Sequence, residues 1–90
     1  MIVRIATEGQ YEVADEDVAE LNKLDNAAVA SCETSDEASF HEVYEQLLDY
    51  VRSHGKKIDD LIGSDIILPP PDVSLAEASS KFTGDGLIPD

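Results

Sequence analysis

Residues 34–55, TSDEASFHEVYEQLLDYVRSHG, are the most strongly patterned stretch of this 90-residue chain, and they decide the expected fold. The stretch opens with a capping signal, because Thr34 and Glu37 stand at the spacing of a capping box. Basic side chains near its end suit the negative pole of a helix, and Gly55 is a natural stop. Apolar side chains recur at helical spacing and predict a buried helix face formed by Phe40, Val43, Tyr44, Leu47, Leu48 and Val51.

A second helix is expected immediately before this one. Asp17 and Glu20 form a variant of the capping box, so the helix is predicted to begin near Asp17. The connection over residues 33–35 is short, which makes the two helices an antiparallel αα-hairpin. The stripe expected to face the core consists of Val18, Leu21, Leu24, Ala28, Val29 and Cys32. The polar residues expected on the solvated side are Asn22, Lys23, Asp25 and Asn26.

The N-terminal segment is expected to form a β-hairpin. Residues 2–6 and 11–13 are rich in β-branched and aromatic side chains, and they flank a turn that contains Gly9. Apolar and polar side chains alternate along both runs, so one face of the pair is apolar. Because a two-stranded hairpin alone is marginal in water, it must pack on the helices or pair its edge with another chain.

The C-terminal third has a different character. Residues 58–68 are apolar but interrupted by acidic residues and Gly63, and the three prolines that follow fix an extended path. Ser74 and Glu77 form a capping box that opens a short helix, whose apolar residues are Leu75, Ala78 and Phe82. Ninety residues leave room for one core, so residues 1–90 are predicted to form a single domain. Its predicted class is α+β, with the N-terminal β-hairpin packed on the antiparallel αα-hairpin, an extended Pro-rich segment and a short C-terminal helix.

The net charge of the chain argues against some classes of binding partner. Twenty acidic residues face six basic ones, which gives a formal net charge of −14. Nucleic acid is therefore not an expected partner, and the same repulsion argues against docking on anionic lipid. No apolar run is long enough to span a membrane and the N-terminus does not read as a signal peptide, so we expect no membrane insertion and a cytoplasmic location. The acids are scattered along the chain, which favours adaptation to a salt-rich cytoplasm over a docking surface for a basic partner.

The residues that could carry chemistry form no recognisable site. Cys32 is the sole cysteine, so an internal disulfide is excluded and a packing role is favoured over a catalytic thiol. His41 and His54 stand thirteen positions apart and cannot hold a metal alone. The run TGDG at residues 83–86 follows a helix and ends it instead of cradling phosphate. We therefore expect no catalytic, cofactor-binding or metal-binding residues, and no enzyme.

Candidate partner-binding residues come from the two segments whose backbone or apolar groups are least satisfied by the chain itself. The hairpin edge could extend a sheet into a homodimer through Ile2, Val3, Ile5, Tyr11 and Val13. The tail could grip an amphipathic helix through Ile66, Leu68, Pro69, Pro70, Pro71, Leu87 and Ile88. The alternative is that the tail only completes the core, which is the slightly favoured interpretation of an apolar tail.

Several stretches carry a resemblance to a known family: MIVRI at the N-terminus, EGQYEV, SDIILPPPDVSLAEA and the closing GLIPD. Together with the acidic helical hairpin, they resemble the PspAA family over essentially the whole chain. The resemblance implies a small domain associated with the phage-shock protein PspA in envelope-stress systems of bacteria and archaea. The strong acidity resembles the proteins of extremely halophilic microbes, so a halophilic archaeon is the expected source.

The resemblance implies a non-enzymatic adaptor beside a PspA-like coiled-coil protein that protects a stressed cytoplasmic membrane. In that role the chain would be cytoplasmic and recruited to the inner face of the membrane through its partner. The alternative hypothesis, from another class, is a small-molecule-binding or enzymatic domain with a site between hairpin and tail. A closed apolar pocket with convergent polar groups would favour this alternative.

Overall fold

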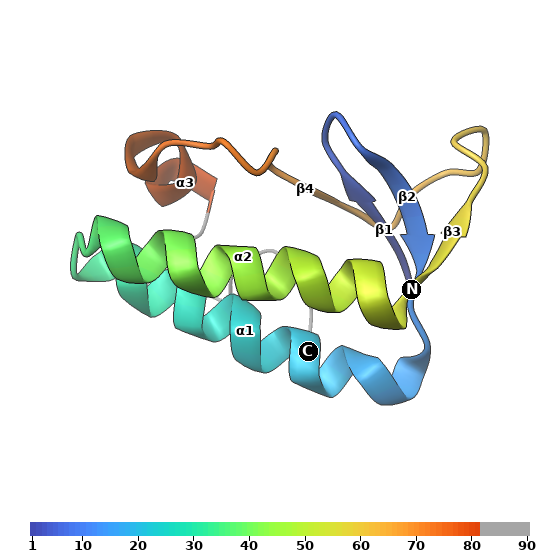
Figure 1. The fold of residues 1–90 in the computed structure, drawn as a ribbon, viewed down its shortest axis with the longest axis horizontal. Coiled ribbons are helices and arrows are strands. Elements are labelled where there is room, and N and C mark those ends of the chain that lie inside the picture. Colours follow the sequence, from blue (N-terminus) through green and yellow to red (C-terminus); the bar gives the residue numbers. More distant parts are fainter. Residues whose placement is uncertain (82–90) are drawn as a thin grey trace.

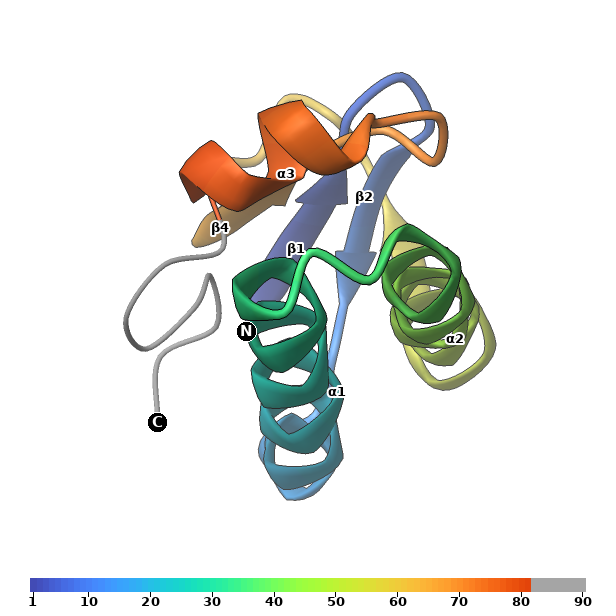
Figure 2. The same cartoon turned by 90° about the vertical axis from the view of Figure 1, so that its left-hand side faces the viewer.

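The computed structural model describes residues 1–81, and the remaining residues, which include Phe82, Leu87 and Ile88, lie outside the described part. Two long antiparallel helices lie side by side beneath a small sheet (Figures 1 and 2), which confirms the α+β class and the αα-hairpin. In chain order the elements are β1 (Ile2–Ile5), β2 (Gly9–Glu12), α1 (Asp15–Glu33), α2 (Glu37–His54), β3 (Lys56–Ile58), β4 (Ile66–Leu68) and α3 (Leu75–Lys81).

The sheet has four strands in the order β3-β2-β1-β4, and not only the two of the predicted hairpin. β2 pairs antiparallel with both β1 and β3, whereas β4 pairs parallel with β1. β3 and β4 have three residues each, too few for a strand pattern to stand out in the sequence. Because they flank the hairpin on both sides, the expectation that its edges are free to extend a sheet into a homodimer is wrong.

One face of the sheet packs on the helices and forms the core. Side chains alternate along β1, so Val3 and Ile5 point toward the helices and are fully buried, as is Leu68 beside them on β4. From α2, the predicted stripe is buried at five of its six positions, while Val43 is half-buried. The other buried apolar residues are Val13, Leu21, Ala28, Val29, Cys32, Val73 and Ala78.

The C-terminal segment is part of this core as far as the structure describes it. Pro69 is buried, and its carbonyl oxygen accepts a hydrogen bond from the hydroxyl of Tyr44 on α2. Val73 and Ala78 follow and are 3% and 0% exposed. The Ser74 hydroxyl accepts a hydrogen bond of 3.2 Å from the backbone nitrogen of Glu77, so the predicted N-terminal cap of α3 is confirmed. The tail residues described here therefore complete the fold.

The predicted caps of the two long helices are wrong. α1 begins at Asp15, and its N-cap, Ala14, has no side chain that could cap it. α2 is capped by Asp36, whose carboxylate accepts a hydrogen bond of 3.1 Å from the backbone nitrogen of Ser39. Thr34 instead closes α1, because its hydroxyl donates to carbonyl oxygens of the last turn.

Asp25 is also misplaced by the sequence analysis. It was expected on the solvated side of α1, yet it is fully buried. Its position explains this, since Asp25 stands four residues after Leu21 and three before Ala28, on the same face of the helix. The burial of Asp25 therefore follows from its position on the helix and not from the polarity of its side chain.

Gly55 ends α2 as predicted, but for a steric reason. Its φ of −81° is accessible to any residue. A Cβ atom at this position, however, would lie 2.9 Å from the Cβ of Tyr11 and still closer to the carbonyl oxygen of Val51. The chain can therefore pass from α2 into β3 this close to β2 only because residue 55 has no side chain.

One ion pair joins the β1–β2 turn to the end of α2. The Arg52 guanidinium donates two hydrogen bonds to the Glu8 carboxylate, one of them 2.8 Å long, and a third of 2.8 Å to Asp49. Both Arg52 and Glu8 are about 30% exposed or less. These hydrogen bonds from Arg52 lower the pKa of the Glu8 carboxyl below its ordinary value.

We expect Ser35→Gly to stabilise the protein. Ser35 follows α1 at a φ of 54°, and the Ser35 and Asp36 nitrogens donate to Cys32 and Ser31 carbonyls in a Schellman pattern. A left-handed conformation costs a residue with a side chain about 1 kcal/mol that glycine does not pay, so Tm should rise by about 4 °C or more. Thermal melts check this. Thr34→Gly is the control, because Thr34 has a φ of −89° and should gain nothing.

The Glu8–Arg52 pair should stabilise the fold in a pH-dependent way. Because the folded-state pKa of Glu8 is lowered, its contribution is present above the ordinary value of 4.5 and is lost as pH falls through the folded value. Glu8→Gln should therefore reduce the free energy of unfolding by about 1 kcal/mol at neutral pH and by much less at pH 3. Urea titrations at both pH values measure the difference.

Asp49→Asn is the matched control for Glu8→Gln, since Asp49 contacts the same guanidinium but its side chain is 64% exposed. It should have the smaller effect at neutral pH. An equal loss of stability from the two variants, or a Glu8→Gln effect that persists unchanged in acid, would contradict a specific link between the turn and α2.

Candidate functional site

The described residues offer little to catalysis. Residues 1–81 contain no cluster of three or more His, Cys, Asp or Glu side chains that could hold a metal ion. Cys32 is buried, and this burial raises the pKa of its thiol, which disfavours the reactive thiolate. Tyr50 is half-buried, stacks on His54 with ring centroids 3.9 Å apart, and donates a hydrogen bond of 3.1 Å to Asp17. It therefore packs between the helices and is not a free surface aromatic.

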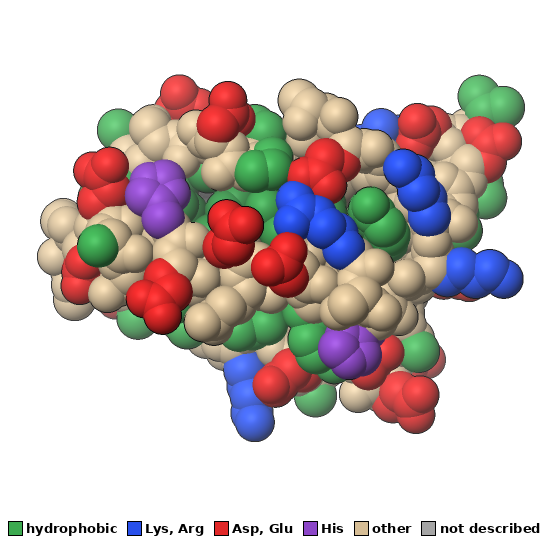
Figure 3. All heavy atoms as spheres, viewed as in Figure 1, with side chains coloured by type: hydrophobic (Ala, Val, Ile, Leu, Met, Phe, Trp, Pro, Cys, Tyr) green, Lys and Arg blue, Asp and Glu red, His purple; other side chains and the backbone are tan. Residues whose placement is uncertain are grey.

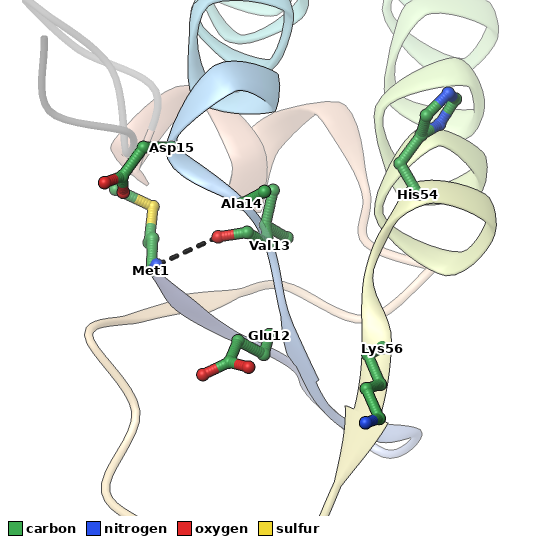
Figure 4. A pocket seen from close by; sticks show the side chains of 7 residues that line it. All are labelled: Met1, Glu12, Val13, Ala14, Asp15, His54 and Lys56. Carbon is green, nitrogen blue, oxygen red and sulfur yellow. Dashed lines mark hydrogen bonds between the residues drawn. The ribbon is translucent and has the colours of Figure 1, made fainter.

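One hollow of about 440 Å³ lies where β2 ends and the two long helices meet the sheet. Its polar side chains do not converge, since Glu12 and Lys56 point away from His54 (Figure 4). The Met1 nitrogen is already used in a hydrogen bond of 3.0 Å to the Val13 carbonyl. The residues that line it are Met1, Glu12, Val13, Ala14, Asp15, His54 and Lys56. It is not located between hairpin and tail, where a small-molecule site was the alternative expectation.

The sheet face that points away from the helices is a second candidate. Strand register places one residue from each strand in a row across this face: Ile58, Gln10, Arg4 and Ile67. They point away from the helices because each alternates with a helix-facing neighbour, as Arg4 does between Val3 and Ile5. Among the described elements no helix covers this row (Figure 1). We call it the outer face.

The loop between β3 and β4, residues 59–65, folds over part of the outer face. The side-chain nitrogen of Gln10, which is fully buried, donates hydrogen bonds to the carbonyl oxygens of Asp59 and Ile62, at 3.1 and 2.5 Å. The Arg4 guanidinium donates to the Asp60 carbonyl at 3.2 Å. At the far end of the loop, the backbone of Ile2 exchanges hydrogen bonds with Asp65. The loop is thus attached to β1 and β2 by polar contacts.

The large apolar side chains that remain exposed among the described residues all belong to this region. Leu61 is 92% exposed, Ile62 47% and Ile67 59%. Leu61 and Ile62 lie on the loop, and Ile67 lies on β4 beside Arg4. We call these three residues the outer apolar patch. An exposed apolar patch on a small domain indicates an interaction site more often than chance.

The residues predicted to bind a partner are scattered by the fold. Val13, Leu68 and Pro69 are buried in the core, so a partner cannot reach them in this structure. Tyr11, Ile66 and Pro70 are half-buried, Pro71 is exposed, and Leu87 and Ile88 lie outside the described residues.

Sequence reasoning missed the outer apolar patch. The signal that could have located Ile67 is the alternation in IIL at 66–68, which sends the middle residue to the opposite face. Nothing in the pattern distinguishes Leu61 from a core residue, because its exposure follows from the loop contacts beneath it.

Acidic and basic residues are distributed differently on the helices and on the sheet. Half of the twenty acidic residues lie on α1 and α2, which carry only Lys23 and Arg52 as basic residues. Figure 3 shows acidic side chains over the helices and also beside the sheet, where Lys and Arg side chains lie among them. Three of the six basic residues, Arg4, Lys56 and Lys57, lie on strands of the sheet. The sheet side is therefore much closer to neutral than the helix side.

No helix within residues 1–81 has the length and apolar character needed to cross a bilayer. A search of curated proteins and a search of solved structures each found no match. The family model of the PspA-Associated protein, PspAA, matches residues 1–90. The match covers the whole sequence given, so the chain belongs to the PspA-Associated protein family.

Proposed function

We propose that this protein is a non-enzymatic adaptor that binds a PspA-like coiled-coil protein in the membrane stress response. The observation that carries the proposal is the family match, because it spans residues 1–90 and the family is named for its association with PspA. The geometry is compatible with it. A domain that works by binding needs an accessible contact surface more than a closed pocket, and the outer apolar patch supplies one.

The absence of enzymatic activity is part of this proposal. Catalysis requires polar groups that converge on a reacting atom, and among the described residues the side chains around the hollow diverge instead. The thiol of Cys32, with its raised pKa, is a poor nucleophile. These observations support binding over chemistry as the role of the domain.

We place the protein in the cytoplasm and propose that it reaches the inner face of the membrane only through its partner. A chain with a net charge of −14 is repelled by anionic lipid headgroups. Recruitment through a protein avoids that repulsion, because the partner can provide both the membrane contact and a surface for the adaptor.

The adaptor proposal is tested by binding. The purified protein should form a saturable complex with the recombinant PspA-like coiled-coil protein of its source organism, measured by calorimetry and by size-exclusion chromatography. An unrelated coiled coil of similar length and charge is the control and should not bind. If the intact protein binds neither in dilute buffer nor in molar KCl, the adaptor proposal is wrong.

We also propose that the acidic surface adapts the protein to a salt-rich cytoplasm, such as that of a halophilic archaeon. Charge is spread over the helices without a single block, so added salt should screen repulsion throughout the folded state. Thermal melts should show Tm rising by about 5 °C or more from dilute buffer to molar KCl, equivalent to roughly 1 kcal/mol.

The control for the salt effect is pH. Near the isoelectric point of about 4.1 the net charge disappears, so the same increase in KCl should change Tm far less. A Tm that is independent of KCl at neutral pH would contradict salt adaptation and favour the acidic surface as a docking site.

A further inference from the structure

We infer that the outer apolar patch, Leu61, Ile62 and Ile67, is the docking surface for a net-basic, amphipathic segment of the partner protein, which the patch contacts through that segment's apolar stripe. This inference rests on the proposed function, since it assigns the contact surface of the same adaptor. It concerns residues that play no part in the hydrophobic core.

The patch is a built feature of the fold. Leu61 and Ile62 remain in water although burying such side chains is favourable, because polar contacts beneath them hold the loop in place. The carbonyl oxygens of Asp59 and Ile62 accept hydrogen bonds from the buried Gln10 side chain. The Asp59 carboxylate also accepts a hydrogen bond of 2.8 Å from the Leu61 nitrogen. These hydrogen bonds restrain the loop at Asp59, Leu61 and Ile62, which reduces the entropy cost of binding.

The three residues belong to one surface. Arg4 lies directly beside Ile67 in the register of β1 and β4, and its guanidinium reaches the Asp60 carbonyl in the loop. Ile67 on β4 and Gln10 on β2 lie on either side of Arg4, so Ile67 is two strand spacings, roughly 10 Å, from the residue that holds the loop, on the same face of the sheet. A single apolar stripe of a partner can therefore contact the loop and β4 together.

The charge of the protein favours one kind of binding partner for the patch over the others. At low ionic strength the field of the whole chain, whose net charge is −14, attracts a basic partner and repels a second copy of the chain. On the outer face, the Arg4 guanidinium contacts the loop at the Asp60 carbonyl and offsets part of the acidic charge there. A net-basic partner fits these constraints better than a homodimer.

The test uses the full chain and the recombinant PspA-like coiled-coil protein as the probe. The double variant Leu61→Ser/Ile67→Thr should bind about tenfold more weakly or worse, with the loss appearing in the dissociation rate. Added KCl should instead slow association of the wild type, because it screens the attraction of the basic partner. Since both substituted side chains are mostly exposed, Tm should stay within about 3 °C of the wild type.

The matched control is Ala19→Ser/Ala30→Ser, two exposed positions on α1 far from the patch in sequence and in element. It should bind as the wild type does. If the wild type binds the probe and the patch variant binds equally well, the surface assignment is wrong and the adaptor role survives. If the patch variant instead abolishes self-association seen for the wild type in sedimentation, or binding of the wild type to anionic vesicles, a second copy or a lipid surface is the occupant and the inference is overturned. If the wild type does not bind the probe, the adaptor proposal itself fails.

Discussion

The rest of the fold depends on the burial of Tyr44, a residue of α2, against the segment that follows β4. Its ring stacks on Phe40 with centroids 5.4 Å apart, and its hydroxyl donates to the carbonyl oxygen of Pro69. A buried hydroxyl without an acceptor would be costly, so this bond fixes the chain just after β4 against the middle of α2. Burial also raises the pKa of the Tyr44 phenol, which keeps it a donor under all physiological conditions. With β4 fixed, β1 gains its second neighbour and the tail continues into the core.

The parts predicted from sequence are those set by local pattern. The stripe of α2, the αα-hairpin, the N-terminal hairpin and the Ser74 cap all follow from residues close in the chain. The errors arise where distant residues decide. β3 and β4 are strands because the hairpin pairs with them, and Asp25 is buried because of its place on the helix. Asp36 caps α2 in place of Thr34, which the end of α1 had already engaged.

The candidate surface was harder to predict than the fold. From the sequence, Ile66 and Leu68 are candidate partner-binding residues and Ile67 is passed over, because local pattern does not show which face of a three-residue strand is covered. In the structure the same three-residue strand sends Leu68 inward and Ile67 outward. The exposure of Leu61 depends on hydrogen bonds from Gln10, about fifty positions away, which no local pattern reveals. Under the proposed adaptor role, this surface is the accessible contact face that a binding protein needs.

The parallel pairing of β1 with β4 has a consequence for how the protein is made. Ile2 and Asp65, which are 63 positions apart, are held together, so the central strand cannot acquire its second neighbour until most of the chain has left the ribosome. The β1–β2 hairpin and the two helices can form earlier, because their contacts join residues that are near in the chain. The sheet can be completed only when β4 pairs with β1, across the 63 positions that separate Ile2 from Asp65. During that interval β1 presents an unpaired edge, because Val3 and Ile5 lack their β4 partners Ile66 and Leu68, and the nascent chain is at its most prone to aggregation.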